Sequence, residues 1–433
     1  MTHSGKEIDF RNFILKKIKE GVKLNKRDAE RFAAQFDISD KNAVKELCEL
    51  AIVFRARDLA HSEKPMKGRY DDIVKLYRSQ VNLSHRTSQS VMLQQYSTPA
   101  PIAFLAGSFV YRKSGGAAYF EPSAGNGLLT IALPANQTTV NEIDEFRSKN
   151  LAEQLFMKQL RQDATEPFGM NKMFEGIITN PPFGKLDKTI TVDSFPINTL
   201  DHVMAIRALD CMKDDGRAAI IIGGHTEWDS EGRIKAGKNR IFFSYLYRNY
   251  RVSDVINIDG DLYSRQGTSF DVRLILIDGR KAKPEGYPPL KDADDTVVKA
   301  FETLFQRVEN WIDARVYENI KSNYTGNETF RELIQKRYNN WLHDRYIKNK
   351  PITKEQKLFL DRICEHIQRN ASIEPQSLQY APFNSMGGAA KFLKLFGDQW
   401  KEVLNEMNLL AEDERLRIAR AKAKLRLLNL KLL

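Results

Sequence analysis

The sequence has little cysteine and no cluster of histidines. Its 433 residues include three cysteines, Cys48, Cys211 and Cys364, which lie far apart between apolar neighbours. This spacing excludes a disulfide framework and a cysteine zinc site, and it predicts reduced core thiols in a cytoplasmic protein. The seven histidines are scattered, so no metal site is expected.

Long apolar runs are also missing, whereas positive charge is abundant. Residues 1–9 contain no apolar signal core, and no uninterrupted apolar stretch reaches membrane length, so neither a signal peptide nor a membrane partner is expected. The formal charge of +11 and the pI near 9.3 favour a polyanionic partner. With 42% hydrophobic residues, the chain can bury a large core in two or three domains.

The most informative segment is a polar tip at the end of an apolar run. Residues 174–179 predict a buried strand, and Asn180, Pro181, Pro182 and Phe183 follow it. Two consecutive prolines fix φ and remove two N–H donors, so the Asn180 amide and the nearby carbonyls point outward as hydrogen-bond partners. Such a tip can accept both hydrogens of a planar amino group while an aromatic ring stacks on the attached heterocycle. A Pro-Pro turn that closes a strand is the alternative.

A glycine turn lies about 55 residues upstream of the tip. A short strand at 117–120 leads into it, and the apolar residues 128–133 predict a helix after it. The turn contains Glu121, Pro122, Ser123, Gly125 and Gly127, and its two glycines are expected to face a ligand. Glycine allows the backbone to approach a ligand closely, and a helix that begins there offers free N–H groups. Thr130 stands where a dinucleotide fingerprint has its third glycine, which argues against NAD.

Acidic residues follow the next two predicted strands. The strand at 138–141 ends in Glu142 and Ile143, about 20 residues after the glycine turn, where a carboxylate can accept both ribose hydroxyls of a nucleoside. The segment at 159–161 leads to Asp163 and Ala164, where an acid can bond an adenine amino group. A loop cap is the alternative for Asp163.

Together these segments resemble the class I, S-adenosylmethionine-dependent DNA methyltransferases that modify the exocyclic amino group of adenine. The family's catalytic tetrapeptide is Asp, Asn or Ser, then Pro-Pro, then an aromatic, and residues 180–183 match it. The resemblance implies S-adenosyl-L-methionine as cofactor, a glycine motif at 121–127, Glu142 as the ribose acid and Asp163 as the adenine-side acid. Upstream, Tyr96 and Thr98 resemble the cofactor segment that flanks the methionine end. The order of these motifs is the γ arrangement.

The resemblance covers roughly residues 90–280. The continuation at 185–209 is most similar to the methyltransferase domains of strawberry notch-type proteins, although no helicase motif is present in this chain. Ser-Ala-Gly-Asn at 123–126 replaces the commoner Ala-Cys-Gly-Ser, which leaves the backbone cradle intact. Tyr263 stands where the family often places a second aromatic against the target base, and a core tyrosine is the alternative.

The predicted fold is α/β: a doubly wound, mostly parallel, seven-stranded Rossmann-like methyltransferase sheet with helical regions on either side in sequence. Residues 1–90 predict a helical region with N-caps at Asn25 and Ser39, and residues 91–280 the methyltransferase domain. Residues 185–198 are expected to form a loop. Residues 281–433 predict a helical, basic region for DNA binding and target recognition, in which Arg337 and Arg420 are candidate phosphate contacts; solvated helix faces are the alternative.

The predicted function is direct methyl transfer to N6 of an adenine rotated out of double-stranded DNA. The Asn180 side-chain oxygen and the Pro181 carbonyl would accept the two amino hydrogens, and Phe183 would stack on the base. No metal or covalent intermediate is required. RNA, or the glutamine amide of a protein, is the nearest alternative substrate, and an inactive DNA-binding protein is the alternative from another class. A nuclease or helicase partner would lie on another chain.

Overall fold

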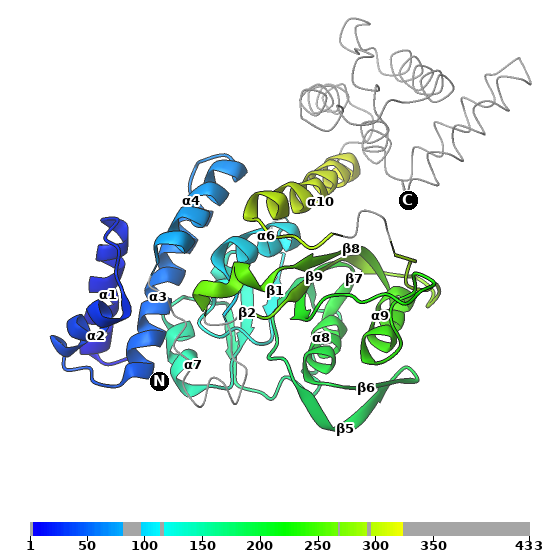
Figure 1. The fold of residues 1–433 in the computed structure, drawn as a ribbon, viewed down its shortest axis with the longest axis horizontal. Coiled ribbons are helices and arrows are strands. Elements are labelled where there is room, and N and C mark those ends of the chain that lie inside the picture. Colours follow the sequence, from blue (N-terminus) through cyan, green and yellow to red (C-terminus); the bar gives the residue numbers. More distant parts are fainter. Residues whose placement is uncertain (1–2, 81–96, 113–116, 267–268, 292–295, 324–433) are drawn as a thin grey trace, which may run out of the picture. The chain divides into compact units, whose positions relative to one another are not determined.

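The computed structural model describes residues 3–80, 97–112, 117–266, 269–291 and 296–323, with side chains as far as residue 312. By its internal contacts the chain divides into two units, Met1–Glu309 and Asn310–Leu433. The N-terminal helices therefore belong to the same unit as the sheet (Figure 1). The basic residues expected at 331–348 and 412–426 lie outside the described residues.

The N-terminal region is helical, as predicted. Its helices are α1 Gly5–Lys19, α2 Lys26–Ala34, α3 Lys41–Ala60 and α4 Met66–Ser79. Asn25 is the N-cap of α2 and accepts a hydrogen bond from the Asp28 N–H at 3.0 Å, which confirms that prediction. The cap of α3 is Asp40 rather than Ser39: Asp40 accepts from the Asn42 N–H at 2.9 Å, so the helix begins one residue later than expected.

The predicted seven-stranded sheet is confirmed. Its strands are β1 Tyr119–Glu121, β2 Thr138–Asn141, β3 Lys158–Leu160, β4 Phe174–Thr179, β7 Met212–Gly223, β8 Tyr250–Ile258 and β9 Val272–Arg280. They lie in the order β3-β2-β1-β4-β7-β9-β8. Only β9 runs antiparallel to its neighbours. The order reverses between β1 and β4, and ligands of doubly wound sheets bind outside the carboxyl ends of the strands at such a switch point.

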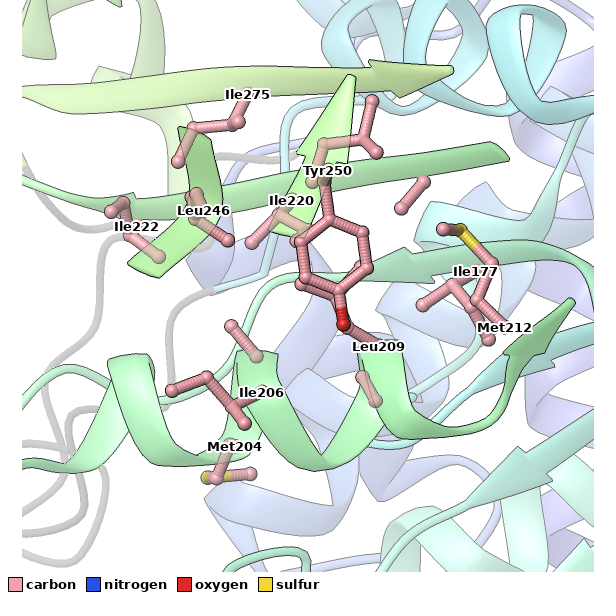
Figure 2. Packing of buried hydrophobic residues seen from close by; sticks show 14 of the residues in the cluster. Ile177, Met204, Ile206, Leu209, Met212, Ile220, Ile222, Leu246, Tyr250 and Ile275 are labelled. Carbon is pink, nitrogen blue, oxygen red and sulfur yellow. The ribbon is translucent and has the colours of Figure 1, made fainter. Parts of the chain in front are cut away.

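Helices cover both faces of the sheet. Helix α6 Ala100–Val110 lies on one face, and α8 Leu200–Asp210 and α9 Lys238–Asn249 lie on the other (Figure 1). Within the core, the ring of Tyr250 reaches from the sheet toward Leu209 of α8 (Figure 2). Ile220, Ile221 and Ile222 of β7 are fully buried. A strand that is apolar on both faces is typical of the centre of a parallel sheet. The ends of β4 and β7 therefore lie at the middle of the sheet.

The expected loop at 185–198 is instead a β-hairpin. Strands β5 Lys185–Val192 and β6 Phe195–Thr199 pair antiparallel across Asp193 and Ser194, which both have positive φ. Positive φ at both turn residues gives a two-residue turn that suits the twist of a hairpin. The ring of Phe195 packs edge-on against that of Tyr245 in α9, with 5.8 Å between the ring centroids, so the hairpin is anchored to the domain. The sequence hid this because the turn carries Asp-Ser rather than Asn-Gly.

The expected helix at 128–133 is also wrong. Only a 3-10 turn, Leu128–Thr130, follows the glycines. Pro134 comes four residues later; it has no N–H and disfavours helical backbone in the residue before it. Too few residues remain between Gly127 and Pro134 to nucleate an α-helix. The N–H groups of a helix N-terminus are therefore not the ligand contacts of this turn.

Candidate functional site

The polar tip begins where β4 ends, at the centre of the sheet. Strand β4 spans Phe174–Thr179, so Asn180 is the first residue beyond it. The Asn180 amide Nδ2 donates to the Thr98 hydroxyl at 2.9 Å, although the two residues are 82 positions apart. Thr98 is buried just before α6. The structure therefore brings the tetrapeptide and the upstream segment together, as the resemblance implied; Tyr96 lies outside the described residues.

The ring of Phe183 rests on the backbone of Gly223, at the end of β7. A Cβ atom added to Gly223 would lie 3.1 Å from Phe183 Cγ and 3.2 Å from Cδ2. A side chain at this position would push the ring away by a few tenths of an ångström, so glycine allows the ring its present distance. Phe183 is half-buried, so part of the ring stays exposed. We call the Gly223 backbone beneath the ring the seat of Phe183.

Two buried charged residues hold this seat, and sequence reasoning missed both. Asp201 accepts a hydrogen bond from the Gly223 N–H at 3.3 Å, and Arg273 donates to the Gly223 carbonyl at 2.7 Å. Arg273 is 1% exposed, and burial lowers its pKa to about 10. Burial also raises the pKa of Asp201. Burying charges is costly unless they make specific bonds, so these contacts indicate that the geometry of Gly223 matters.

Both glycines of the turn adopt the left-handed backbone conformation that glycine favours. Gly125 has φ +55° and Gly127 has φ +88°. A Cβ at Gly125 would meet nothing within 4 Å, whereas one at Gly127 would lie 2.7 Å from Gln154 Oε1. Gly127 is thus glycine because of close packing, and Gly125 faces open space. A ligand can approach the backbone at Gly125.

Glu142 is tied to this turn. Its Oε2 accepts from the Gly125 N–H at 2.7 Å, and its Oε1 accepts from the Asp144 N–H at 2.9 Å. The carboxyl is buried, which raises its pKa. Each carboxylate oxygen has a second lone pair, so Glu142 can still accept ribose hydroxyls. Ile143, directly after it, is 59% exposed and presents an apolar side chain beside the acid.

Glu121 ends β1 and is fully buried. Its Oε1 accepts from both the N–H and the hydroxyl of Ser123, at 3.0 and 3.1 Å. Its Oε2 has no hydrogen-bond partner among the described residues. Burial raises the pKa of Glu121 to about 8, although the Ser123 bonds oppose the shift. The Ser123 hydroxyl also lies 3.0 Å from that of Thr179, which links the ends of β1 and β4.

The remaining predicted residues either make local contacts or are buried. Asp163 Oδ1 accepts from the N–H and the hydroxyl of Thr165, at 2.9 and 2.8 Å, which are the bonds of the loop-cap alternative. Pro122 stays within the turn as the acceptor of the Asn141 amide, and Ala164 is buried. Tyr263 is 1% exposed, so the structure favours the core alternative for this residue.

A different aromatic, Phe270, is available at the same edge of the sheet. It is 54% exposed and comes two residues before Val272, which pairs with Gly223. The Asp271 carbonyl accepts from the Gly224 N–H at 2.7 Å, which holds this segment beside the seat of Phe183. Sequence reasoning missed Phe270; its one signal was a large aromatic placed just before a strand that begins at the site.

Among the described residues there is neither a candidate metal site nor a membrane-spanning helix. In the described ranges, no group of three or more His, Cys, Asp and Glu side chains could hold a metal ion. No helix there is long and apolar enough to cross a bilayer.

The chain is similar to methyltransferases and restriction proteins. A family model described as "EcoEI R protein C-terminal" matches residues 288–410. No curated protein matches the chain. Similar solved structures include a Listeria monocytogenes protein described as a class I S-adenosylmethionine-dependent methyltransferase, with 13% identity, 72% of this chain and 92% of that chain covered, and a TM-score of 0.38. Another is the M protein of the type I restriction enzyme EcoKI, with 14% identity, 64% and 68% covered, and a TM-score of 0.35.

The type IIG restriction endonuclease BpuSI is also similar, with 12% identity, 75% of this chain and 43% of that chain covered, and a TM-score of 0.35. Identities and TM-scores this low say nothing about the substrate of this chain.

Proposed function

We propose that this chain transfers a methyl group from S-adenosylmethionine to N6 of an adenine rotated out of double-stranded DNA. The observation that carries the proposal is the bond between Asn180 and Thr98, because it joins the tetrapeptide to the upstream segment at the switch point of the sheet. A turn that merely closed a strand would need no buried partner 82 residues away.

The residues around the glycine turn fit S-adenosylmethionine. The open space at Gly125 admits a ligand to the backbone, Glu142 can accept from its ribose, and the exposed Ile143 can cover a face of its adenine. The unpartnered Glu121 oxygen suits a cationic amino group, which would restore the ionised form of this buried carboxyl. Tyr96 and Asp163 remain predicted contacts. When bound, the cofactor supplies an electrophilic methyl group on sulfur.

The tip then acts on the target amine. The Asn180 oxygen and the Pro181 carbonyl accept hydrogen bonds from its two N–H groups and stabilise the charge that develops on nitrogen, which loses one proton to solvent once the methyl group is bound. Thr98 holds the Asn180 amide while this happens. Phe183, on its Gly223 seat, stacks on the extruded base and offsets part of the unstacking cost of a few kcal/mol. Phe270 is the candidate second aromatic in place of Tyr263.

The wider setting we propose is a restriction-modification system. The similarity of residues 288–410 to the EcoEI R protein C-terminal model supports a partner from such a system, of the nuclease or helicase kind. The net charge of +11 supports DNA as substrate. A cytoplasmic location and the closer relation to strawberry notch-type methyltransferase domains stay predictions.

Methyl transfer by purified protein tests the proposal. We expect wild type to label adenine N6 in duplex DNA, and Asn180→Ala to lose on the order of a hundredfold in rate at unchanged melting temperature and cofactor affinity. RNA and protein substrates assayed in parallel address the alternatives. Preferred labelling of RNA or of a glutamine amide would replace DNA as the substrate, and wild-type activity in Asn180→Ala would refute the role of the tip.

A further inference from the structure

Helix α3 of the N-terminal region touches the glycine turn through a buried carboxylate. Asn126, between the two glycines, donates its Nδ2 to Glu46 Oε2 at 2.6 Å. We infer that Glu46 is a positioning residue that sets the conformation of this turn, so that the N-terminal helices form part of the cofactor site. The inference rests on the proposed function, since it concerns the same cofactor.

The side chain of Asn126 is held on all sides. The side-chain Oδ1 of Asn126 accepts from Asn150 Nδ2 at 2.7 Å, and the backbone carbonyl of Asn126 accepts from Gln154 Nε2 at 2.8 Å. Asn150 and Gln154 lie in and just after α7, Glu145–Ala152, and both are buried. A turn with two glycines has many backbone conformations of similar energy, so its shape depends on such outside contacts. Among these contacts of Asn126, Glu46 is the one that comes from the N-terminal helices.

Glu46 is itself fixed by charge. Arg147 of α7 donates to both of its oxygens, at 3.1 and 3.3 Å, and Asn150 donates to its backbone carbonyl at 3.2 Å. Burial raises the pKa of Glu46, but Arg147 and Lys45 outweigh burial, and the net pKa is lowered. Glu46 is therefore ionised and accepts from Asn126 as a carboxylate.

The same network reaches the ribose acid and the upstream segment. Burial raises the pKa of Glu142, and the charge of Arg147 opposes that rise, so Arg147 acts on Glu46 and Glu142 together. Glu49 lies one turn further along α3 and is buried. Burial and the charge of Glu46 raise the pKa of Glu49, and a hydrogen bond from Ser97, next to Thr98, opposes that rise. One helix thus contacts two of the segments that surround the proposed cofactor.

A swap of the two interacting groups tests the role of Glu46. Asn126→Asp alone places a second carboxylate against Glu46, whereas Glu46→Gln with Asn126→Asp reverses the donor of this bond and keeps the total charge. Because Glu46 Oε2 also accepts from Arg147 Nε, the swap gives up that one Arg147 bond. By calorimetry we expect Asn126→Asp to raise the Kd of S-adenosylmethionine about tenfold or more, and Glu46→Gln alone by about threefold. The double variant should recover part of the loss and bind the cofactor more tightly than Asn126→Asp. Asp58→Asn, on the same helix, is the matched control, because its exposed pair with Lys19 contributes little.

Hydrogen exchange of the amides at 124–128 gives a readout that does not depend on the cofactor. Exchange should rise in Asn126→Asp and fall again in the double variant. A double variant that binds as weakly and exchanges as fast as Asn126→Asp would overturn the inference. Absence of cofactor binding by wild type would defeat the proposed function, whereas the exchange pattern would still decide whether Glu46 sets the turn.

Discussion

Replacing Gly223 with alanine tests whether the seat of Phe183 matters for the reaction. The new Cβ would lie 3.1, 3.2 and 3.5 Å from three atoms of the Phe183 ring. Favourable contacts between carbon atoms lie at about 3.5–4.0 Å, so the ring has to move by roughly 0.5 Å. The backbone of Gly223 cannot yield in its place, because Asp201 and Arg273 bind its N–H and carbonyl.

The size of the effect follows from this displacement. A misplacement of about 1 Å near a reacting centre can cost on the order of a hundredfold in rate, so half that distance predicts a loss of about tenfold in kcat for methyl transfer to adenine. The loss of stability should be at the low end of the roughly 1–3 kcal/mol seen for overpacking, since Phe183 is half exposed and can shift toward solvent. Cofactor affinity should not change, because Gly125 lies in the turn after β1 and Glu142 directly after β2, away from Gly223 at the end of β7.

Gly184→Ala is the matched control, because it adds the same methyl group one residue after Phe183. Its Cβ would make ordinary contacts with Leu200, at 3.5 and 3.7 Å. Radiolabelled methyl transfer and thermal melting should be measured for both variants. If Gly223→Ala methylates as fast as Gly184→Ala while both remain folded, the position of the Phe183 ring does not limit the reaction and the reasoning fails.

Four further substitutions probe other parts of the site. Thr98→Val keeps the shape of a buried side chain but removes the hydroxyl that holds Asn180, so kcat should fall about tenfold; a rise in the Kd of the cofactor without a fall in kcat would instead favour the cofactor contact that the resemblance implies for Thr98. Glu121 binds an extra proton in the folded state between its ordinary pKa and about 8, so its contribution to stability is lost as pH rises through that range. Without ligand, the melting temperature of Glu121→Gln should therefore rise relative to that of wild type between pH 5 and pH 8.5. A difference in melting temperature that stays constant over this range would contradict the prediction. Phe270→Ala should slow transfer, whereas Tyr263→Phe, which removes a buried hydroxyl without a partner among the described residues, should leave it unchanged; the reverse result would restore Tyr263 as the base contact.

The parts of the fold that depend on local pattern could be predicted from the sequence. The buried strand at 174–179 matches β4 at both ends, and the two prolines that follow it explain why it ends at Thr179. The placement of Asn180, Gly125 and Glu142 at one edge followed from strand direction alone, since the carboxyl ends of parallel strands meet. That step needed no knowledge of side-chain contacts.

The contacts that hold the site could not be predicted in this way. Asp201 and Arg273 lie 72 positions apart and meet only because β7 lies between α8 and β9 in the fold. Gly223 gave no signal, because a glycine at the end of a strand usually marks a turn rather than a surface for an aromatic ring. Glu46 gave no signal either, because its partner Asn126 is 80 positions away.

These contacts separate two functions within one edge of the sheet. Thr98 and the seat at Gly223 act on Asn180 and Phe183, whereas Glu46 and Glu142 act on the glycine turn, and the two sets share no bond among those described. Distant sites without shared partners contribute nearly additively. Changes in the first set should therefore lower kcat, and changes in the second should raise the Kd of the cofactor. A protein in which both sets altered the same quantity could couple them through Ser123 and Thr179, whose hydroxyls join the ends of β1 and β4, or through α3, where Glu49 is bonded by Ser97 beside Thr98. Thr179→Val separates the two routes, because it should disconnect the two effects only if the hydroxyl contact carries the coupling.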